Sequence, residues 1–342
     1  MMTASYSVAI RTIGTAGEKY IQLIKSIGAQ TVKPDKIIVV LPEGCAVPER
    51  IDGNEEFVFS LKGMVSQRLT AVNYTDSKYI LFCDDDVELS PDFAELLLNT
   101  LELGNYQCAS GPLLSFFPPK KAKYIIASLL GGACIMLHGR KDTYTRLLAT
   151  TGWSYNHTID TKVHKTYNAD SLAWTCFCIN RETMLSIKFE DELWLQRNGY
   201  AAFDDQSFFT KLKLYGYKTC VVSDAAYIHN DAKTSTQGKT DEIVYNYSFN
   251  QAVYWYRFMY SVSNSVWRKR WVTVCFAYKL AMSYLYKVYM IIAGRAEKTI
   301  IRIERDGRRD AIAFVKSDEY QQIPSVFSHR GDKDGHCVHT NL

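Results

Sequence analysis

Apolar runs of strand length alternate with segments of helical spacing along the first hundred residues. Tyr6–Ile10 and Lys36–Leu41 are nearly continuous apolar runs, and Glu18–Ile27 between them places its apolar residues at helical spacing. A strand, a helix and a second, almost wholly apolar strand indicate a βαβ unit on a parallel sheet. The start of the chain is therefore expected to form part of a buried sheet with helices on its faces.

The same alternation continues with four more elements. We expect an edge strand near Phe57, a helix over Met64–Tyr74, a buried strand over Tyr79–Cys83 and a helix over Phe93–Leu101. This order predicts an α/β fold whose ligand crevice lies at the carboxyl ends of the strands.

Three consecutive carboxylates, Asp84, Asp85 and Asp86, directly follow the buried strand. Because adjacent carboxylates repel one another, the cluster is costly to assemble without a cation, and its oxygen ligands suit Mg²⁺ or Mn²⁺. Alternation along an extended chain sends Asp84 and Asp86 to one side and Asp85 to the other. This D-x-D arrangement can hold a metal that in turn holds a diphosphate. The alternative is an ordinary acidic turn that caps the next helix.

Composition narrows the class of protein. The chain has 342 residues, is 47% hydrophobic and 22% charged, and can bury a full core. Its nine cysteines are odd in number and its first residues do not form an apolar signal segment, so we expect a reducing compartment. The formal net charge of +4 is too small to indicate nucleic-acid binding.

Two segments of the chain resemble a known family. They are SVAIRTIGTAGEKYIQLIKSIGAQTVKPDKIIVV and GMVSQRLTAVNYTDSKYILFCDDDVELSPD. Gln30-Thr31 before Pro34, Gln67-Arg68 in the helix before the acidic strand, and the D-x-D itself are spaced as in glycosyltransferase family 2. Its members are inverting enzymes with the GT-A fold. The resemblance implies a mixed, mostly parallel sheet flanked by helices, and a nucleotide-diphosphate sugar as donor.

The resemblance also assigns residues to the donor. It places Thr12 and Arg68 against the nucleotide and Asp84 near the ribose and the metal. Family members usually carry acidic residues directly after the second strand to read the base, and here Glu43 is the nearest substitute. The residues assigned to the donor or its Mn²⁺ or Mg²⁺ ion are Thr12, Glu43, Arg68, Asp84, Asp85 and Asp86.

A second acidic pair, Asp204 and Asp205, opens a helix that is followed by a strand over Thr219–Val222. This resembles the second signature of the family, which implies that Asp205 is the catalytic base. Sugar transfer with inversion needs such a carboxylate to take the acceptor hydroxyl's proton. The alternative is that the pair only caps the helix and stabilises its dipole. We assign Trp174 and Asp204 to the acceptor.

His229 ends the run Lys218–His229. A neutral imidazole is a good third ligand for Mn²⁺ or Mg²⁺ beside two carboxylates. Family members with a histidine at this spacing use it in this way, so the resemblance implies a metal site of Asp84, Asp86 and His229. A structural histidine is the alternative.

The last hundred residues change in character. Tyr245–Ile303 is rich in tyrosine, tryptophan, arginine and lysine, and acids are almost absent. Trp271–Ile292 is nearly long enough to span a bilayer, but Lys279 and Lys287 lie within it. Such helices suit the headgroup region of an anionic membrane. The alternatives are a helical pair packed on the catalytic domain and a nucleic-acid surface, of which the second is disfavoured.

We expect three regions. Residues 1–240 would form the GT-A catalytic domain, with a nucleotide-sugar half at 1–105 and an acceptor half at 106–240. Residues 241–316 would form an aromatic and basic helical appendage, and the polar tail at 317–342 is predicted to be disordered.

The sequence as a whole predicts a metal-assisted glycosyltransferase that adds a hexose or related sugar to a glycan or lipid-linked acceptor. By resemblance, the product belongs to bacterial surface polysaccharide, and the enzyme works in the cytoplasm or at the inner face of the plasma membrane. One alternative is a nucleotidylyltransferase, although Arg11–Gly17 is not the glycine-rich basic loop typical of that class. The other is a catalytically silent sugar-nucleotide-binding or scaffold protein.

Overall fold

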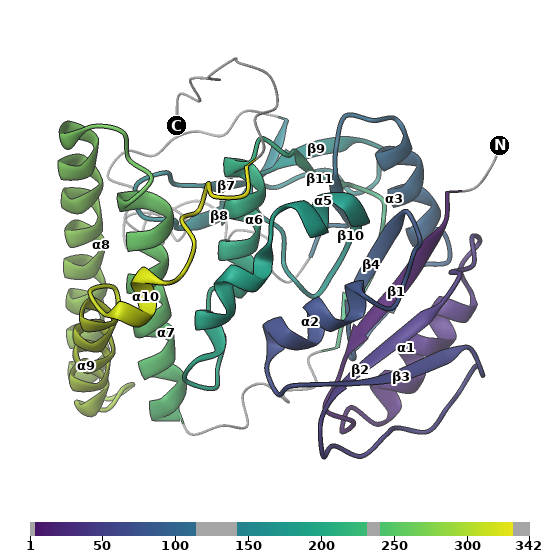
Figure 1. Ribbon diagram of the computed structural model, residues 1–342, viewed down its shortest axis with the longest axis horizontal. Coiled ribbons are helices and arrows are strands. Elements are labelled where there is room, and N and C mark those ends of the chain that lie inside the picture. The colour runs from purple at the N-terminus through teal and green to yellow at the C-terminus, as the bar shows by residue number, and fades with distance from the viewer. Residues whose placement is uncertain (1–3, 114–141, 231–239, 331–342) are drawn as a thin grey trace.

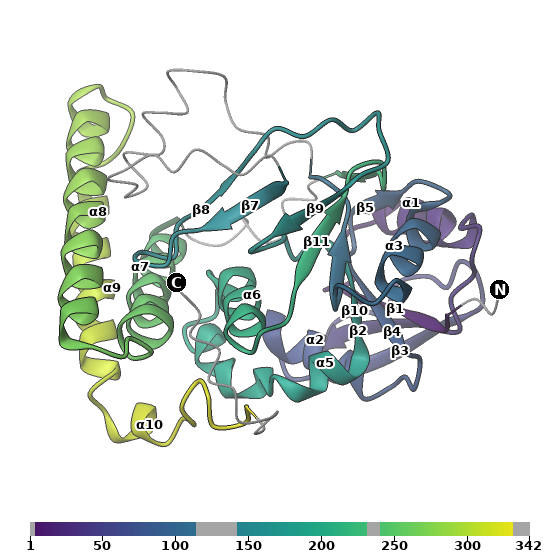
Figure 2. The same cartoon turned by 90° about the horizontal axis from the view of Figure 1, so that it is seen from above.

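A mixed β-sheet runs through the molecule with helices on both faces (Figure 1, Figure 2). The computed structural model describes residues 4–113, 142–230 and 240–330. Within these residues the sheet has ten strands in the order β3-β2-β1-β4-β10-β6-β11-β9-β7-β8.

The first half of the sheet is parallel. It consists of β1 (Tyr6–Arg11), β2 (Ile37–Pro42), β3 (Glu55–Ser60) and β4 (Tyr79–Asp84). Strands β2 and β4 are buried along their whole length, because helices cover both faces. Helices α1 (Glu18–Gly28) and α3 (Phe93–Glu102) pack on one face, and α2 (Met64–Val72) packs on the other. The predicted βαβ unit and edge strand are confirmed.

The second half of the sheet alternates in direction. Strand β10 (Cys176–Asn180) lies antiparallel between β4 and β6 (Cys108–Ser110), and β11 (Thr219–Val222) runs parallel to β6. The remaining strands complete the sheet as β9 (Thr166–Ala169), β7 (Thr143–Leu147) and β8 (Ser154–Asn156). The predicted α/β class with a mixed, mostly parallel sheet is thus confirmed. The short strands β6 to β9 were not predicted.

A separate two-stranded ribbon lies beside the main sheet. It pairs β5 (Val87–Leu89) with β12 (Tyr227–His229) in antiparallel register, so that His229 faces Val87. Because β5 begins one residue after Asp86, this pairing brings distant parts of the chain together at the acidic loop.

Helices follow the last strands. Helices α5 (Arg181–Ser186), η2 (Phe189–Gln196) and α6 (Asp204–Leu214) lie within the sheet domain. After residue 240 come α7 (Thr240–Trp255), the π-helical turn η4 (Tyr256–Tyr260), α8 (Val266–Ile292), α9 (Thr299–Phe314) and α10 (Asp318–Gln321).

The C-terminal helices share the core of the sheet domain. Phe249, Tyr254 and Phe258 belong to the same buried cluster as Phe208 of α6 and Phe177 of β10. The expected division at residue 240 is therefore not a boundary between two cores. The tyrosine-rich sequence resembled a surface segment, but helical spacing directs several of its rings inward.

The expected disorder of the tail is wrong for residues 317–330. Ser317 caps α10 by accepting a hydrogen bond from the Tyr320 N–H, and Tyr320 and Val326 are buried. Tyr320 packs edge to face against Phe314. Residues 331–342 lie outside the described part of the chain.

A buried cluster of charges joins α6 to the C-terminal helices. Arg257 of η4 donates two hydrogen bonds to Glu192 of η2, at 2.7 and 2.9 Å. Lys211 of α6 lies 3.0 Å from the same carboxylate and 3.1 Å from Asp191. Burial raises the pKa of Glu192, but the charges of Arg257 and then Lys211 together lower it by more, so that the pKa lies below its ordinary value. The cluster fixes α6, and with it the acidic pair at its start.

Among the described residues, no helix is both long enough and apolar enough to cross a membrane. The seven cysteines in these residues are all free thiols.

Candidate active site

The acidic cluster lies where two neighbouring parallel strands end. Strand β1 ends at Arg11 and β4 ends at Asp84, and these two residues are register partners. Side chains from both strand ends therefore meet at one edge of the sheet, as the fold rule for α/β proteins predicts.

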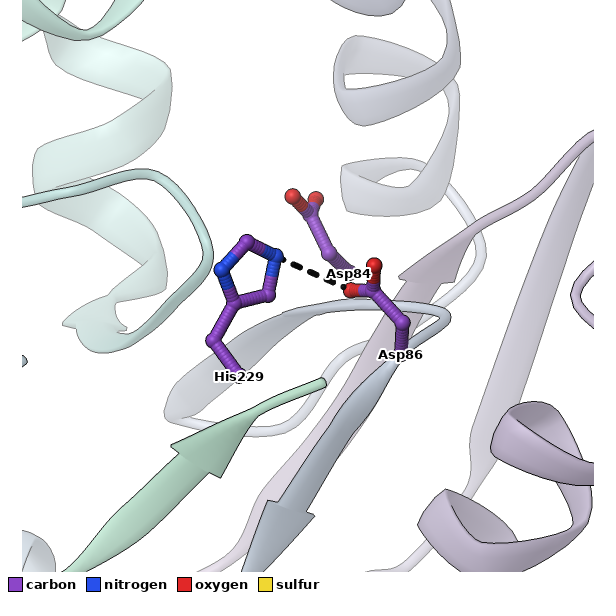
Figure 3. A group of neighbouring side chains, drawn as sticks. All are labelled: Asp84, Asp86 and His229. Atoms are coloured by element: carbon purple, nitrogen blue, oxygen red, sulfur yellow. Dashed lines mark ion pairs between the residues drawn. The ribbon is translucent and has the colours of Figure 1, made fainter. Parts of the chain in front are cut away.

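Asp84, Asp86 and His229 come together as a possible metal site. One ligand atom from each lies within 4.8 Å of the others, and His229 Nε2 is 3.3 Å from Asp86 Oδ1. Figure 3 shows the three side chains converging from the end of β4, the turn after it and the end of β12. Two carboxylates and an imidazole are ligands that fit Mn²⁺ or Mg²⁺. Asp85 is not part of this group, in agreement with the expected placement of Asp84 and Asp86 on one side, although Asp86 lies in the turn after β4.

Arg11 was missed by the sequence analysis and holds Asp84. Its Nε and Nη2 atoms donate to the two oxygens of Asp84 at 2.8 and 2.9 Å. Burial lowers the pKa of the Arg11 guanidinium, but pairing with Asp84 raises it more, so that the net shift is upward. The bidentate pair fixes the orientation of the carboxylate. The available signal was the position of Arg11 at the end of an apolar strand that precedes the first crevice loop.

Arg68 bridges the two acidic groups. It is 3% exposed; Nη1 pairs with Asp204 Oδ2, and Nη2 lies 3.6 Å from Asp84 Oδ1. The guanidinium also stacks on Trp174, with its central carbon 4.2 Å from the ring centroid. Burial, and secondarily the neighbouring Arg11 cation, lower the pKa of Arg68. One buried cation thus connects the D-x-D loop to the start of α6.

Asp204 and Asp205 have different surroundings. Asp204 is buried, paired with Arg68, and accepts a hydrogen bond from the Asp205 N–H at 2.9 Å. Asp205 is only partly buried, and its Oδ1 accepts from the Gln206 N–H at 2.7 Å. Burial, and then the charge of Asp204, raise the pKa of Asp205 to about 7. A carboxylate with such a pKa can exchange a proton near neutral pH.

Thr12, Asp85 and Glu43 are the remaining residues that the sequence assigned to the donor. Thr12 Oγ1 donates to Asp85 Oδ2 at 2.5 Å and accepts from the Gly14 N–H at 2.9 Å. Burial raises the pKa of Asp85 to about 6, although its hydrogen bond from Thr12 acts in the opposite direction. Glu43 is exposed just after β2, the strand next to β1. In this structure Thr12 and Asp85 therefore brace the loop together.

Trp174 does not suit the acceptor role assigned to it. It is 4% exposed and packs against Phe82, Phe177, Phe189 and Phe208. One face of its ring stacks on the Arg68 guanidinium, and the buried ring has no open face for a sugar. The sequence identified an important position, but it could not show that the ring points into the core. Residues 114–141 and 231–239 of the expected acceptor half lie outside the described ranges.

Comparisons with known proteins agree with the resemblance in the sequence. Residues 58–170 match the family model described as glycosyl transferase family 2. The matched segment contains Arg68 and the three aspartates at 84–86, and it ends before Trp174, Asp205 and His229. Over these residues the match agrees with the predicted family.

Similarity to individual proteins is more distant. No curated protein matches the chain. Among solved structures, a crystal structure of GalNAc-T7 with UDP, GalNAc and Mn²⁺ aligns over 85% of this chain at 10% identity, with a TM-score of 0.48. The aligned part spans 58% of that protein.

Proposed function

Residues 58–170 belong to glycosyl transferase family 2, and from this we propose that the protein transfers a sugar from a nucleotide-diphosphate sugar to an acceptor hydroxyl, with inversion at the anomeric carbon. The observation that carries the proposal is the pairing of two acidic groups across Arg68. One group, Asp84, Asp86 and His229, suits a divalent metal, and the other presents Asp205 with a raised pKa.

The charge balance of the site supports donor binding through a divalent cation. Five aspartates, at positions 84, 85, 86, 204 and 205, occupy the D-x-D loop and the start of α6, and among them Asp84 and Asp204 pair with the cations Arg11 and Arg68. A diphosphate would add further negative charge. Asp84, Asp86 and His229 would hold Mn²⁺ or Mg²⁺, which when bound neutralises the diphosphate and stabilises it as a leaving group.

Asp205 supplies the proton acceptor. As the acceptor oxygen attacks the anomeric carbon, its proton passes to Asp205 while the bond between that carbon and the diphosphate oxygen breaks. Arg68 pairs with Asp204, and the raised pKa of Asp205, about 7, lets that carboxylate take up a proton near neutral pH. The positive end of the α6 dipole favours the ionised carboxylate before the reaction.

For the acceptor, the proposal names a broad chemical class. We infer a glycan or lipid-linked hydroxyl, within the synthesis of a bacterial surface polysaccharide on the cytoplasmic side of the plasma membrane. The support for this placement is the family resemblance and the aromatic and basic character of Tyr245–Ile303.

Titration calorimetry tests the donor site. A panel of nucleoside diphosphates and their sugars would be titrated with and without Mn²⁺ into the wild-type protein, Asp86→Ala and Glu88→Ala. Glu88 is the control because it is an exposed acid on β5, two residues from Asp86. Altering partners one shell beyond a metal already costs about 10- to 100-fold in affinity, so Asp86→Ala should weaken Mn²⁺-dependent donor binding at least tenfold. Donor binding that needs no metal, or that survives in Asp86→Ala, would exclude this site.

A further inference from the structure

Helix α8 presents an apolar face to solvent. Figure 1 and Figure 2 place α8 at the outer edge of the molecule, beyond α7 and on the side away from the N-terminal strands. Val272, Cys275, Phe276 and Lys279 are its buried residues, and Phe276 stacks on Trp255 of α7 at 4.5 Å. The other side of the helix, its outer face, is therefore exposed to solvent.

The outer face is a stripe of uncharged, mostly large side chains. At about 100° per residue, its members fall within roughly 80° of one another over about 38 Å of helix. Trp267 is 77% exposed, Leu285 58% and Ile292 80%, so neither end of the stripe is covered. The stripe consists of Trp267, Trp271, Val274, Tyr278, Ala281, Leu285, Tyr289 and Ile292.

Cations flank this stripe at both ends. Arg270 is exposed and lies 5.2 Å from the Trp267 ring centroid, and Arg295 and Lys298 are exposed just past the end of α8. No acidic residue occurs in the sequence between Glu242 and Glu297. Lys279 and Lys287, in contrast, do not face outward. Lys279 is buried, which lowers its pKa to about 8, and Lys287 pairs with Glu304 of α9.

We propose that the outer face of α8 docks the protein on an anionic lipid bilayer, with the helix lying in the plane of the headgroups. Exposed tryptophan and tyrosine beside apolar residues match the interface between headgroups and acyl chains. The flanking cations complement anionic lipid, each contributing about fivefold in binding.

Charge favours a bilayer over a second copy of the chain as the occupant. Parallel packing of two α8 helices would bring Arg270 against Arg270, and antiparallel packing would bring Arg270 toward Arg295. Neither arrangement supplies an acid within the stripe, because none occurs between Glu242 and Glu297, and the exposed Glu297 lies past the end of α8 between Arg295 and Lys298. Anionic headgroups provide the missing negative charge.

Vesicle flotation of the full-length protein tests the proposal. The wild type should float with phosphatidylcholine vesicles that contain phosphatidylglycerol, and much less with pure phosphatidylcholine. Binding should fall when salt is raised from about 0.1 M to about 1 M, where the screening length drops from about 10 to about 3 Å. Deletion of the region is unsuitable, because α7 and η4 belong to the core.

Two double variants separate the apolar and the charged contributions. Trp267→Ser with Trp271→Ser removes the aromatic anchors at exposed positions and should abolish flotation. Arg270→Glu with Arg295→Glu should lower the partition coefficient at least about 25-fold, the effect of losing two such cations.

A matched control keeps the total charge change the same. Lys33→Glu with Lys218→Glu also brings the net charge from +4 to 0, since each reversal removes two charges, but both residues lie in the sheet domain. This control should float like the wild type. Circular dichroism and melting temperature confirm that each variant is folded.

Three results would overturn the proposal. They are a wild type that does not float at low salt, flotation that survives both α8 variants, and loss of flotation in the lysine control. Sedimentation velocity tests whether a second copy of the chain covers the face instead. A wild type that is dimeric and does not bind vesicles, together with a monomeric tryptophan variant, would assign the face to a second copy. None of these readouts uses sugar transfer, so the proposed enzyme activity is tested separately.

Discussion

Replacement of Asp205 by asparagine tests the proposed base. Asparagine keeps the side-chain oxygen that accepts from the Gln206 N–H, and Asp205 is not the N-cap of α6, so folding should survive. Loss of a positioned base typically lowers the rate by about 10²- to 10⁴-fold. Asp205→Asn should therefore bind donor normally and transfer sugar about 10²- to 10⁴-fold more slowly.

The raised pKa gives the same residue a pH signature. The ionised carboxylate is the active form, so transfer is lost as pH falls through the pKa of about 7. With that pKa, roughly a tenth of the molecules carry the active form at pH 6 and roughly nine tenths at pH 8. The wild-type rate should thus rise about tenfold between these values.

Asp204→Asn is the informative partner variant. The charge of Asp204 is the second cause, after burial, of the raised pKa of Asp205. Removing that charge should therefore shift the acid limb of the pH–rate profile to lower pH. If Asp205 were not the base, Asp204→Asn would leave the limb in place. Single-turnover transfer over this pH range, at saturating metal, measures both effects. Saturating metal keeps His229 protonation from producing the limb. Near-normal transfer by Asp205→Asn, or inactivity that follows unfolding, would refute the assignment.

Two further predictions concern buried charges, where removing one partner of a pair typically costs about 3 to 5 kcal/mol. Arg68→Met should lower the free energy of unfolding by about that amount, because Asp84 and Asp204 lose a shared, buried cation; Arg68→Lys, which keeps the charge, should cost less. Glu192→Gln should cost a similar amount, because it leaves buried Arg257 without its carboxylate and Lys211 with Asp191 alone. Glu190→Gln, exposed on the same helix, should change stability by less than about 0.5 kcal/mol. Chemical unfolding curves for the four variants measure the differences, and equal values for Glu192→Gln and Glu190→Gln would contradict the second.

The parallel half of the sheet could be predicted because its strands are apolar throughout. Ile37–Pro42 is buried at every position, and such a strand is rare outside a sheet covered on both faces. The grouping of Asp84 with Asp86, without Asp85, was also expected from alternation, although β4 ends at Asp84 and Asp86 lies in the turn after it. Strands β6 to β9 were missed because they are three to five residues long and carry polar residues.

The long-range parts of the site could not be read from the sequence. Arg11 reaches Asp84 only because β1 and β4 are neighbours in a particular register, which no local pattern encodes. His229 was selected by family spacing, but the ribbon that carries it to Asp86 depends on pairing two strands of three residues. The direction of the Trp174 ring depends likewise on packing against aromatic residues from several elements.

The buried charge cluster has a consequence for synthesis on the ribosome. Glu192 pairs with Arg257, which is synthesised 65 residues later. Arg257 in turn donates to the carbonyl of Pro324 near the end of the described chain. At about 5 to 20 residues per second, the first interval alone lasts about 3 to 13 seconds. During this time Lys211 is the cation available to Glu192, and α6 lacks the core residues that α7 and η4 supply. Nascent chains stalled before Arg257 should therefore be cut by protease near α6, and chains released at full length should resist.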